Sequence, residues 1–350
     1  MEALQLTGRL YFNQDHFREL ENEKELEWWK IRVLITGGNG LIGSHLAEKL
    51  IDRGDSVTLL DLVFDSNTKS FSCEKIKADI RNYNSIEKAI EGKDAVFHFA
   101  AVSRVVWGQQ DPQGCWSTNT MGTVNVLEAC RKAKDKPTVF YASSREVYGE
   151  PKSFPVTESH PKNPKSVYGT SKVAAETAVS SYYNMLYLNS VIFRFSNVYG
   201  SERDQLKRVI PKFMIQALKN EDIILYGGNQ ILDFTFIDDT VSGILAAYTA
   251  ALEGSKSIIG QDFHFVTGRG VSVSELSEMI VKVANSKSKI ERIQAKDFDV
   301  MKFIGDPAKS KEILGLKAKV KLEDGLKRLK ERIQQRLNSP ELIDRMKKAR

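Results

Sequence analysis

The sequence is poor in cysteine and contains no long apolar run. Its three cysteines are scattered over 350 residues and form no CxxC pair: Cys73, Cys115 and Cys130. An odd, dispersed set argues against a disulfide framework, and no His/Cys cluster indicates a metal site. No apolar stretch approaches the roughly 20 residues of a membrane helix. The N-terminus also lacks the basic patch and apolar stretch of a signal peptide. We therefore expect a cytoplasmic protein with no metal centre and no membrane association.

Positive charge is unevenly distributed. The whole chain carries a net charge of +6. From Asp306 to Arg350 there are 14 Lys and Arg against 7 Asp and Glu, a balance of +7, whereas residues 1–30 hold 4 and 7, a balance of −3. Over 322–336 the basic residues alternate with acids and with apolar residues at helical spacing, which favours a solvated amphipathic helix. We therefore expect no nucleic-acid partner.

A glycine-rich turn is the first motif that indicates chemistry. An apolar, strand-like run over 31–35 precedes three glycines: Gly37, Gly40 and Gly43. Such glycines permit a tight turn and close approach of the backbone to a pyrophosphate, which the following helix N-terminus faces. A second strand over 56–60 ends at Asp61, whose carboxylate can hold the adenosine ribose hydroxyls and would repel a 2′-phosphate. The pattern predicts an NAD site.

Tyr168 and Lys172 form the second motif. They lie one turn apart on a helix predicted over 167–187. A free tyrosine loses its proton near pH 10. A neighbouring lysine cation favours the phenolate and lowers that pKa. A lone Y-x-x-x-K is usually a surface pair, but downstream of a dinucleotide site it indicates removal of a hydroxyl proton during alcohol oxidation.

Strands and helices alternate from Ile31 onward, which predicts an α/β fold with a Rossmann-type doubly wound parallel sheet and a smaller mixed α/β substrate domain. The segment 233–239 and the helix after it are expected to return to the main sheet. We predict four parts: an acidic N-terminal extension, 1–30; an NAD-binding domain, 31–198 plus about 229–258; a substrate-binding domain, 199–228 plus about 259–336; and a basic C-terminal tail, 337–350.

A series of motifs occurs in a fixed order along the chain: Gly37–Gly43, Asp61, Asp79-Ile80, His98–Ala101, Asn119–Val126, Ser143–Gly149, Tyr168-x-x-x-Lys172, Arg194–Gly200 and Val209–Pro211. From about residue 31 to 336 the chain thereby resembles the extended short-chain dehydrogenase/reductases, in the NAD-dependent epimerase/dehydratase branch that acts on nucleotide sugars. Jointly these motifs are specific for the superfamily and much less specific for the reaction.

The resemblance implies roles for individual residues. The implied catalytic residues are Ser144, Tyr168, Lys172 and Glu146. The implied cofactor-binding residues are Gly37, Asn39, Gly40, Leu41, Ile42, Gly43, Asp61, Asp79, Ile80, Phe99, Ala100, Ala101, Asn119, Tyr168 and Lys172. The implied substrate-binding residues are Ser144, Asn197, Arg208 and Val209. Asn119 equally fits a helix cap, Ser143 equally fits a packed serine at a strand end, and Glu146 equally fits a supporting role.

The resemblance implies a reaction through a 4-keto sugar, most like that of a UDP-glucose 4-epimerase, on a nucleotide-diphosphate sugar. A 4,6-dehydratase and a net oxidoreductase are the alternatives. Dehydratases of the family place Asp-Glu after the catalytic Ser or Thr, where this chain has Arg145-Glu146, and an arginine cannot donate a proton at neutral pH. Decarboxylase members usually carry an arginine where this chain has Phe303-Ile304.

Family members that bind uridine diphosphate sugars commonly carry a diphosphate-binding arginine where this chain has Leu232, and another family arginine corresponds to Lys296. Arg208 and Lys207 are placed to compensate. Members of the family are commonly homodimers joined through two helices of each subunit, here those over 119–134 and 168–187, so we expect a homodimer.

Overall fold

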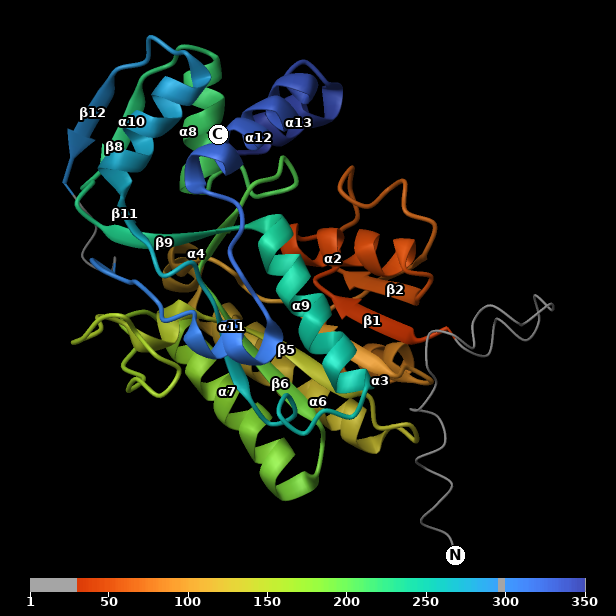
Figure 1. Ribbon diagram of the computed structural model, residues 1–350. Coiled ribbons are helices and arrows are strands. Elements are labelled where there is room, and N and C mark those ends of the chain that lie inside the picture. Colours follow the sequence, from red (N-terminus) through yellow and green to blue (C-terminus); the bar gives the residue numbers. More distant parts are fainter. Residues whose placement is uncertain (1–29, 295–299, 350) are drawn as a thin grey trace, which may run out of the picture.

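A seven-stranded parallel sheet forms the centre of the protein in a computed structural model that describes residues 30–294 and 300–349 (Figure 1). From one edge to the other the strands are β3 (Glu74–Lys77), β2 (Ser56–Asp61), β1 (Arg32–Thr36), β4 (Ala95–His98), β5 (Thr138–Ser144), β6 (Ser190–Phe195) and β10 (Asp262–Phe265). The strand order reverses between β1 and β4, which is where open α/β sheets bind their ligands. The predicted fold class is confirmed.

Alternating apolar side chains on each strand explain why helices cover both faces of this sheet. On β1, Val33 and Ile35 point to one buried cluster and Leu34 to another. One face is covered by α2 (Leu41–Asp52) and α9 (Ile237–Leu252), and the other by α3 (Tyr83–Ile90), α6 (Gly122–Lys132) and α7 (Val167–Leu186) (Figure 1). The predicted helix over 167–187 is therefore a layer of the Rossmann-type fold.

Smaller sheets and further helices make up the rest of the described chain. One sheet has the order β11 (Gly270–Ser272), β9 (Ile231–Phe236), β7 (Asn197–Tyr199), and a second pairs β12 (Ile290–Ile293) with β8 (Ile223–Tyr226). The helices beside them are α8 (Val209–Leu218), α10 (Val273–Ala284) and α12 (Leu322–Arg336). The remaining elements are α4 (Val105–Gln110), α5 (Pro112–Trp116), η3 (Ser117–Met121), η4 (Arg145–Tyr148), α11 (Ala308–Leu314) and α13 (Pro340–Ala349).

The sequence-based prediction for 233–239 is half wrong. The helix after this segment, α9, does return to the main body and packs on α2, but β9 pairs with β7 and β11 instead of joining the central sheet. The seventh strand of that sheet is β10, which lies within the segment from about 259 that we expected in the substrate domain. The division into domains otherwise stays a prediction.

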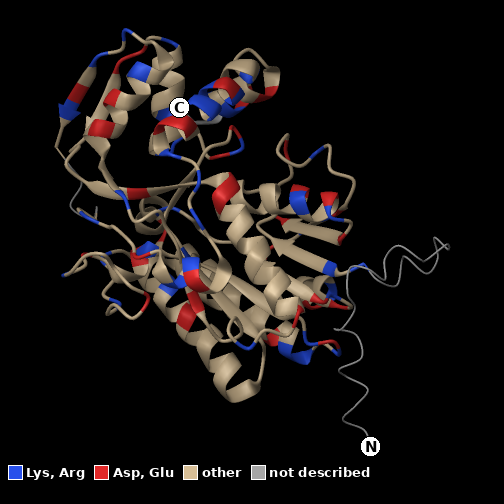
Figure 2. Cartoon of the chain, in the orientation of Figure 1, with Lys and Arg blue, Asp and Glu red and all other residues tan. Residues whose placement is uncertain are grey.

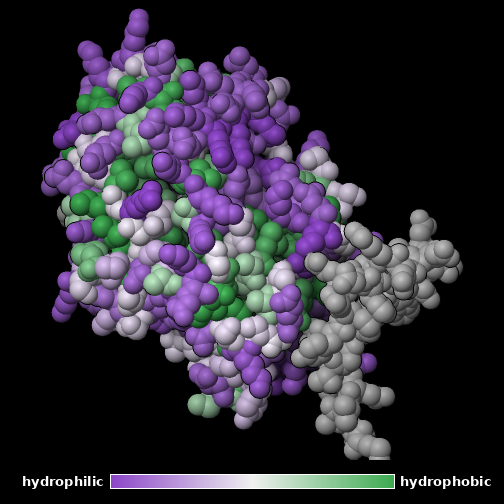
Figure 3. All heavy atoms as spheres, in the orientation of Figure 1, coloured by the Kyte–Doolittle hydropathy of each residue, from purple (hydrophilic) through white to green (hydrophobic). Residues whose placement is uncertain are grey.

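The termini bear on the charge predictions. The acidic extension predicted over 1–30 lies outside the described residues apart from Lys30, as does Lys296. On α12 and α13 basic and acidic side chains alternate (Figure 2), and the surface over these helices is largely hydrophilic (Figure 3). Buried Leu326, Leu329 and Ile333 fix the inner face of α12. Among the residues described, no helix combines the length and apolar character needed to cross a bilayer.

Candidate functional site

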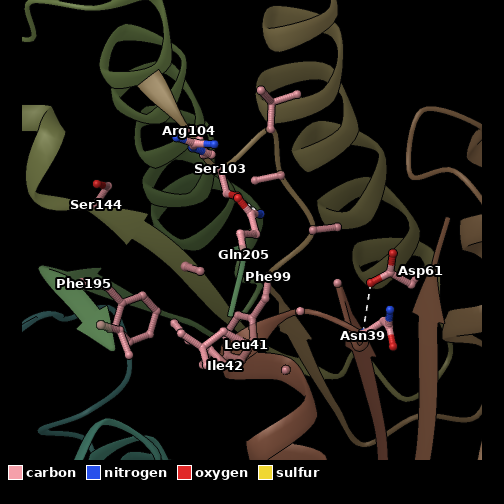
Figure 4. A pocket seen from close by; sticks show the side chains of 18 of the residues that line it. Asn39, Leu41, Ile42, Asp61, Phe99, Ser103, Arg104, Ser144, Phe195 and Gln205 are labelled. Atoms are coloured by element: carbon pink, nitrogen blue, oxygen red, sulfur yellow. Dashed lines mark hydrogen bonds between the residues drawn. The ribbon is translucent and has the colours of Figure 1, made fainter. Parts of the chain in front are cut away.

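A cavity of about 780 Å³ opens at the carboxyl ends of β1, β2, β4 and β5. Its walls bring together the glycine turn, the ends of these strands, the start of α7 and the segment that leads into α8. Asn39 and Asp61 lie at one end and Ser144 toward the other, with Leu41, Ile42 and Phe99 between them (Figure 4). The two ends of the cavity are therefore lined by different residues and can bind different chemical groups.

The glycine turn is shaped for close approach of a ligand. Gly37 has φ +71°, and a Cβ there would lie 2.7 Å from the backbone nitrogen of Ala100. A Cβ on Gly43 would collide with the carbonyl of Gly37. Gly40 is the N-cap of α2, whose first turn receives no side-chain cap and holds no acidic residue. The first residues of this helix line the cavity, and a helix N-terminus without a side-chain cap suits a pyrophosphate.

Asp61 lies at the end of β2 as the sequence predicted. Its carboxylate accepts a hydrogen bond from the backbone N–H of Asn39 at 3.0 Å (Figure 4) and another from that of Leu62 at 2.8 Å. Burial raises the pKa of Asp61, while these N–H bonds act in the opposite direction. A carboxylate fixed beside the glycine turn matches the ribose hydroxyls of NAD. The glycine turn, the uncapped helix end and Asp61 thus fit this cofactor.

The other cofactor residues predicted from the sequence mostly line the same cavity: Asn39, Leu41, Ile42, Asp79, Ile80, Phe99, Ala100 and Ala101. Asp79 is held by Arg81, whose guanidinium lies 2.6 Å from its carboxylate. Asn119 differs, because it lies behind the wall. Its amide donates to the carbonyl of Val102 at 3.1 Å and to Ser171 Oγ at 3.0 Å, and its oxygen accepts from Val102 N–H. It ties the loop after β4 to α7 and does not cap a helix.

Ser144, Tyr168 and Lys172 converge on the cavity from β5 and α7. The hydroxyl of Ser166 caps the first turn of α7, which fixes the start of the helix directly before Tyr168. Lys172 Nζ donates to the carbonyl of Ala142 at 2.8 Å and lies 4.9 Å from the ring centre of Tyr141. The catalytic set predicted from two distant motifs is therefore assembled at one place.

The protonation of this set departs from the prediction. Burial raises the pKa of Tyr168 to about 12, against which the Ser144 hydroxyl and the Arg208 charge act, and Glu146 reinforces the rise. Burial also lowers the pKa of Lys172 to about 8. The net shift is opposite in direction to the predicted acidification, because removal from water outweighs the groups that lower the pKa of Tyr168.

Glu146 lies at the cavity wall but is not free. Its carboxylate is 2.8 Å from Nη2 of Arg145, and both side chains are about nine-tenths buried. Its backbone N–H donates to the Ser144 hydroxyl at 3.2 Å. The ion pair with Arg145 therefore occupies the Glu146 carboxylate at the cavity wall.

A buried charge network supports the serine end of the cavity. Ser143 Oγ donates to Glu176, and both oxygens of Glu176 accept from Arg194 at 2.9 Å. Arg194 also lies 2.6 Å from Asp262, and Lys162 lies 2.6 Å from Glu176. Ser143 is therefore a bonded serine at a strand end that also lines the cavity, and the network fixes the strand that carries Ser144.

The substrate end contains the predicted Asn197, Arg208 and Val209, all of which line the cavity. Asn197 donates to the carbonyl of Asp233 at 3.0 Å. Arg208 is the N-cap residue of α8 and lies 3.4 Å from the buried carboxylate of Asp204.

The cavity lining also includes residues that the sequence did not indicate, among them Arg104, Gln205 and Arg345. Arg104 donates to the carbonyl of Lys207 at 3.1 Å, and its pKa is lowered by burial and by the neighbouring charge of Arg208. Gln205 donates to Ser103 Oγ at 3.2 Å (Figure 4). None of these three residues belongs to a motif, so no local pattern indicated them. Within residues 30–294 and 300–349, no three His, Cys, Asp or Glu side chains are grouped to hold a metal ion.

Comparison with known proteins agrees with this geometry. Residues 33–260 match the NAD dependent epimerase/dehydratase family. A Methanocaldococcus jannaschii protein, provisionally named a UDP-glucose 4-epimerase, is 35% identical over 304 residues, which cover 85% of this chain and 96% of that protein.

Two solved structures are similar over most of the chain. The UDP-glucose 4-epimerase of Thermotoga maritima with UDP-glucose has a TM-score of 0.82 at 28% identity and covers 88% of this chain and 100% of that chain. The UDP-glucuronic acid 4-epimerase of Bacillus cereus with UDP-glucuronic acid and NAD has a TM-score of 0.80 at 29% identity, covering 87% and 99%. With the glycine turn, Asp61 and the Ser144, Tyr168 and Lys172 set in one cavity, these matches show that the chain belongs to the NAD-dependent epimerase/dehydratase family.

Proposed function

We propose that the protein is an NAD-dependent nucleotide-sugar epimerase that acts through a transient 4-keto sugar. One observation carries the proposal: Ser144, Tyr168 and Lys172 share a single cavity with the glycine turn and Asp61. The glycines, the N-terminus of α2 and Asp61 would hold NAD, and Lys172 would reach its nicotinamide ribose. When bound, NAD supplies the acceptor for the hydride that leaves the sugar carbon and later returns to it.

The chain's own residues handle the proton. Ser144 would hydrogen-bond the reacting sugar oxygen, and Tyr168 would accept the proton of that hydroxyl. The pKa of Tyr168 near 12 is too high for a base at neutral pH. Positive charge must therefore stabilise the phenolate at the moment of reaction, and Lys172, Arg208 and, when NAD is bound, its oxidised nicotinamide ring would supply it. The 4-keto sugar would then turn over in the site, and return of the hydride to the opposite face of C4, with return of the proton from Tyr168 to the C4 oxygen, would give the epimer.

A 4,6-dehydratase is the second candidate, favoured by the position of Glu146 at the cavity wall beside Ser144. That reaction also needs an acid for the departing C6 hydroxyl. The neighbouring side chain is Arg145, which pairs with Glu146 at 2.8 Å and cannot give up a proton at neutral pH. We therefore prefer the epimerase.

The diphosphate of the substrate would lie against Arg104 and Arg208. Leu232 stands where relatives commonly carry a diphosphate-binding arginine. Arg104 and Arg208 both line the cavity and lie close enough for the charge of Arg208 to lower the pKa of Arg104. The carboxylate of Asp204 lies near these two cations but can neutralise the charge of only one of them. An anionic diphosphate would therefore be favoured beside Arg104 and Arg208.

Assembly and location remain predictions. A homodimer would be formed through α6 and α7 of each subunit, and we expect the protein in the cytoplasm. Sedimentation of the purified protein tests the first, and fractionation of cells tests the second.

The proposed reaction is tested with protein as purified and no added NAD. A panel of nucleotide sugars is incubated with it, and the products are identified by NMR. We expect a C4 epimer of one substrate, and at least a hundredfold loss of turnover in Tyr168→Phe, since a positioned base contributes about 10²–10⁴-fold. Tyr187→Phe, a change at a tyrosine that is 83% exposed, is the matched control. Undiminished turnover in Tyr168→Phe would show that the catalytic assignment is wrong.

A further inference from the structure

The C-terminal helix α13 contributes one residue, Arg345, to the lining of the functional cavity. The helix spans Pro340–Ala349 and is anchored by Leu342, which is 3% exposed and belongs to the main apolar cluster. One turn further along, Arg345 lines the cavity. The basic C-terminal tail predicted over 337–350 thus reaches the cavity through Arg345.

The guanidinium of Arg345 joins two loops that are distant in sequence. It donates to the carbonyl of Glu202 at 2.7 Å and to that of Asp204 at 2.6 Å, both in the segment between β7 and α8. Its Nη1 also lies 3.4 Å from Oδ1 of Asn67, in the segment between β2 and β3. Both segments contribute lining residues to the cavity.

The bonds continue from Asn67 to the carboxylate that marks the ribose site. The amide of Asn67 donates to the carbonyl of Asn39 at 3.0 Å and to that of Arg203 at 3.1 Å. The backbone N–H of Asn39 in turn donates to Asp61 at 3.0 Å. Arg345 is therefore two residues removed, along hydrogen bonds, from the group expected to hold the adenosine ribose.

The charge surroundings of Arg345 suit a fixed role. Burial disfavours its cation and lowers its pKa, while Asp65, Asp204 and Glu202 act in the opposite direction. Its planar fork reaches two carbonyls at once, which a lysine cannot copy. An arginine held in this way at the C-terminal end of the chain fastens the loops at the cavity rim.

We propose that Arg345 is a positioning residue that slows the release of NAD by joining the two loops beside Asp61. The proposal rests on the NAD site of the proposed function, but it concerns retention of the cofactor and not the reaction. It assigns α13 the part of a strap across the ribose end of the cavity.

The test is the dissociation rate of NAD from full-length protein. Arg345→Ala, Arg345→Lys and the control Lys347→Ala, at an exposed position of the same helix, are loaded with NAD. They are then diluted into charcoal, and the NAD retained is measured over time. Loss of hydrogen bonds from a charged donor predicts roughly tenfold or faster release in Arg345→Ala. Arg345→Lys should be intermediate and Lys347→Ala should equal the wild type.

A second readout separates this role from simple loss of structure. In Arg345→Ala, saturating NAD should restore turnover to near the wild-type value, because the reacting groups are untouched. Release within twofold of the Lys347→Ala rate would overturn the proposal. If Arg345→Ala does not fold, the same comparison is made with Arg345→Lys: release of NAD within twofold of the Lys347→Ala rate would then overturn the proposal. Failure of the proposed reaction is distinguishable, since wild-type protein would then bind NAD and epimerise no nucleotide sugar.

Discussion

Replacement of Lys172 by methionine should stabilise the folded protein at neutral pH while abolishing its activity. Lys172 is 3% exposed, and burial lowers the pKa of its ammonium group to about 8 from the 10.5 of a free lysine. A group whose charge is disfavoured in the folded state costs stability wherever that charge is present. The buried cation of Lys172 thus lowers the stability of the fold, while the proposed reaction requires it.

The magnitude follows from the two pKa values. The unfolded chain binds more protons than the folded chain between about pH 8 and pH 10.5, so this group makes stability rise with pH across that window. Each pKa unit of difference between the folded and unfolded states corresponds to about 1.4 kcal/mol. The charged form of Lys172 therefore lowers the free energy of unfolding at pH 7 by about 3 kcal/mol. The carbonyl of Ala142 loses a donor in Lys172→Met, which costs about 1 kcal/mol. The net gain at pH 7 is therefore about 2 kcal/mol.

Guanidinium unfolding at pH 7 and pH 10, after removal of nucleotide from both proteins, measures this difference. The advantage of Lys172→Met over the wild type, about 2 kcal/mol at pH 7, should be lost almost completely at pH 10, since the wild-type lysine loses most of its penalty by that pH. The control Lys88→Met, at an exposed helical lysine, should leave the pH dependence unchanged. Parallel pH dependences for wild type and Lys172→Met would refute the reasoning.

Three further outcomes are expected. Glu176→Gln should destabilise the fold by about 3 kcal/mol in urea unfolding, because it leaves the buried Arg194 with Asp262 as its remaining carboxylate within 3 Å; a loss below about 1 kcal/mol would argue against the network. Asp61→Ala should weaken NAD binding roughly tenfold and reduce the preference over NADP in calorimetric titrations, since it removes both the ribose acceptor and the repulsion of a 2′-phosphate; an unchanged NAD/NADP ratio would contradict this. Arg104→Met should raise KM for the nucleotide sugar roughly tenfold with little change in kcat, because diphosphate contacts are made equally in ground and transition states; an unchanged KM would exclude the contact.

Local motifs allowed much of the site to be predicted from the sequence. Gly37 and Gly43 are required by a tight backbone turn, and Asp61 is placed by the end of β2. The positions of all three therefore depend on residues that are close in the sequence. The four-residue spacing of Tyr168 and Lys172 likewise fixes their shared helix face. The fold class followed from the alternation of strands and helices for the same reason.

Other features depend on tertiary structure and left no local pattern. The local pattern of 231–236 predicts a strand but does not indicate which sheet that strand joins. Its pairing with β7 and β11 depends on tertiary packing. Arg104 and Arg345 reach the cavity from segments without a motif. The pKa of Tyr168 was misjudged because its burial, which outweighs nearby charges, is a property of the assembled fold.

Transfer of a C4 label tests the central claim most directly. A nucleotide hexose carrying deuterium on C4 is incubated with protein as purified, without added NAD, and the product is followed by NMR and mass spectrometry. We predict a C4 epimer that keeps its deuterium on C4, because the same hydride leaves and returns within one bound complex. Loss of the label to solvent, or product that forms only when NAD is supplied in stoichiometric amount, would contradict the account.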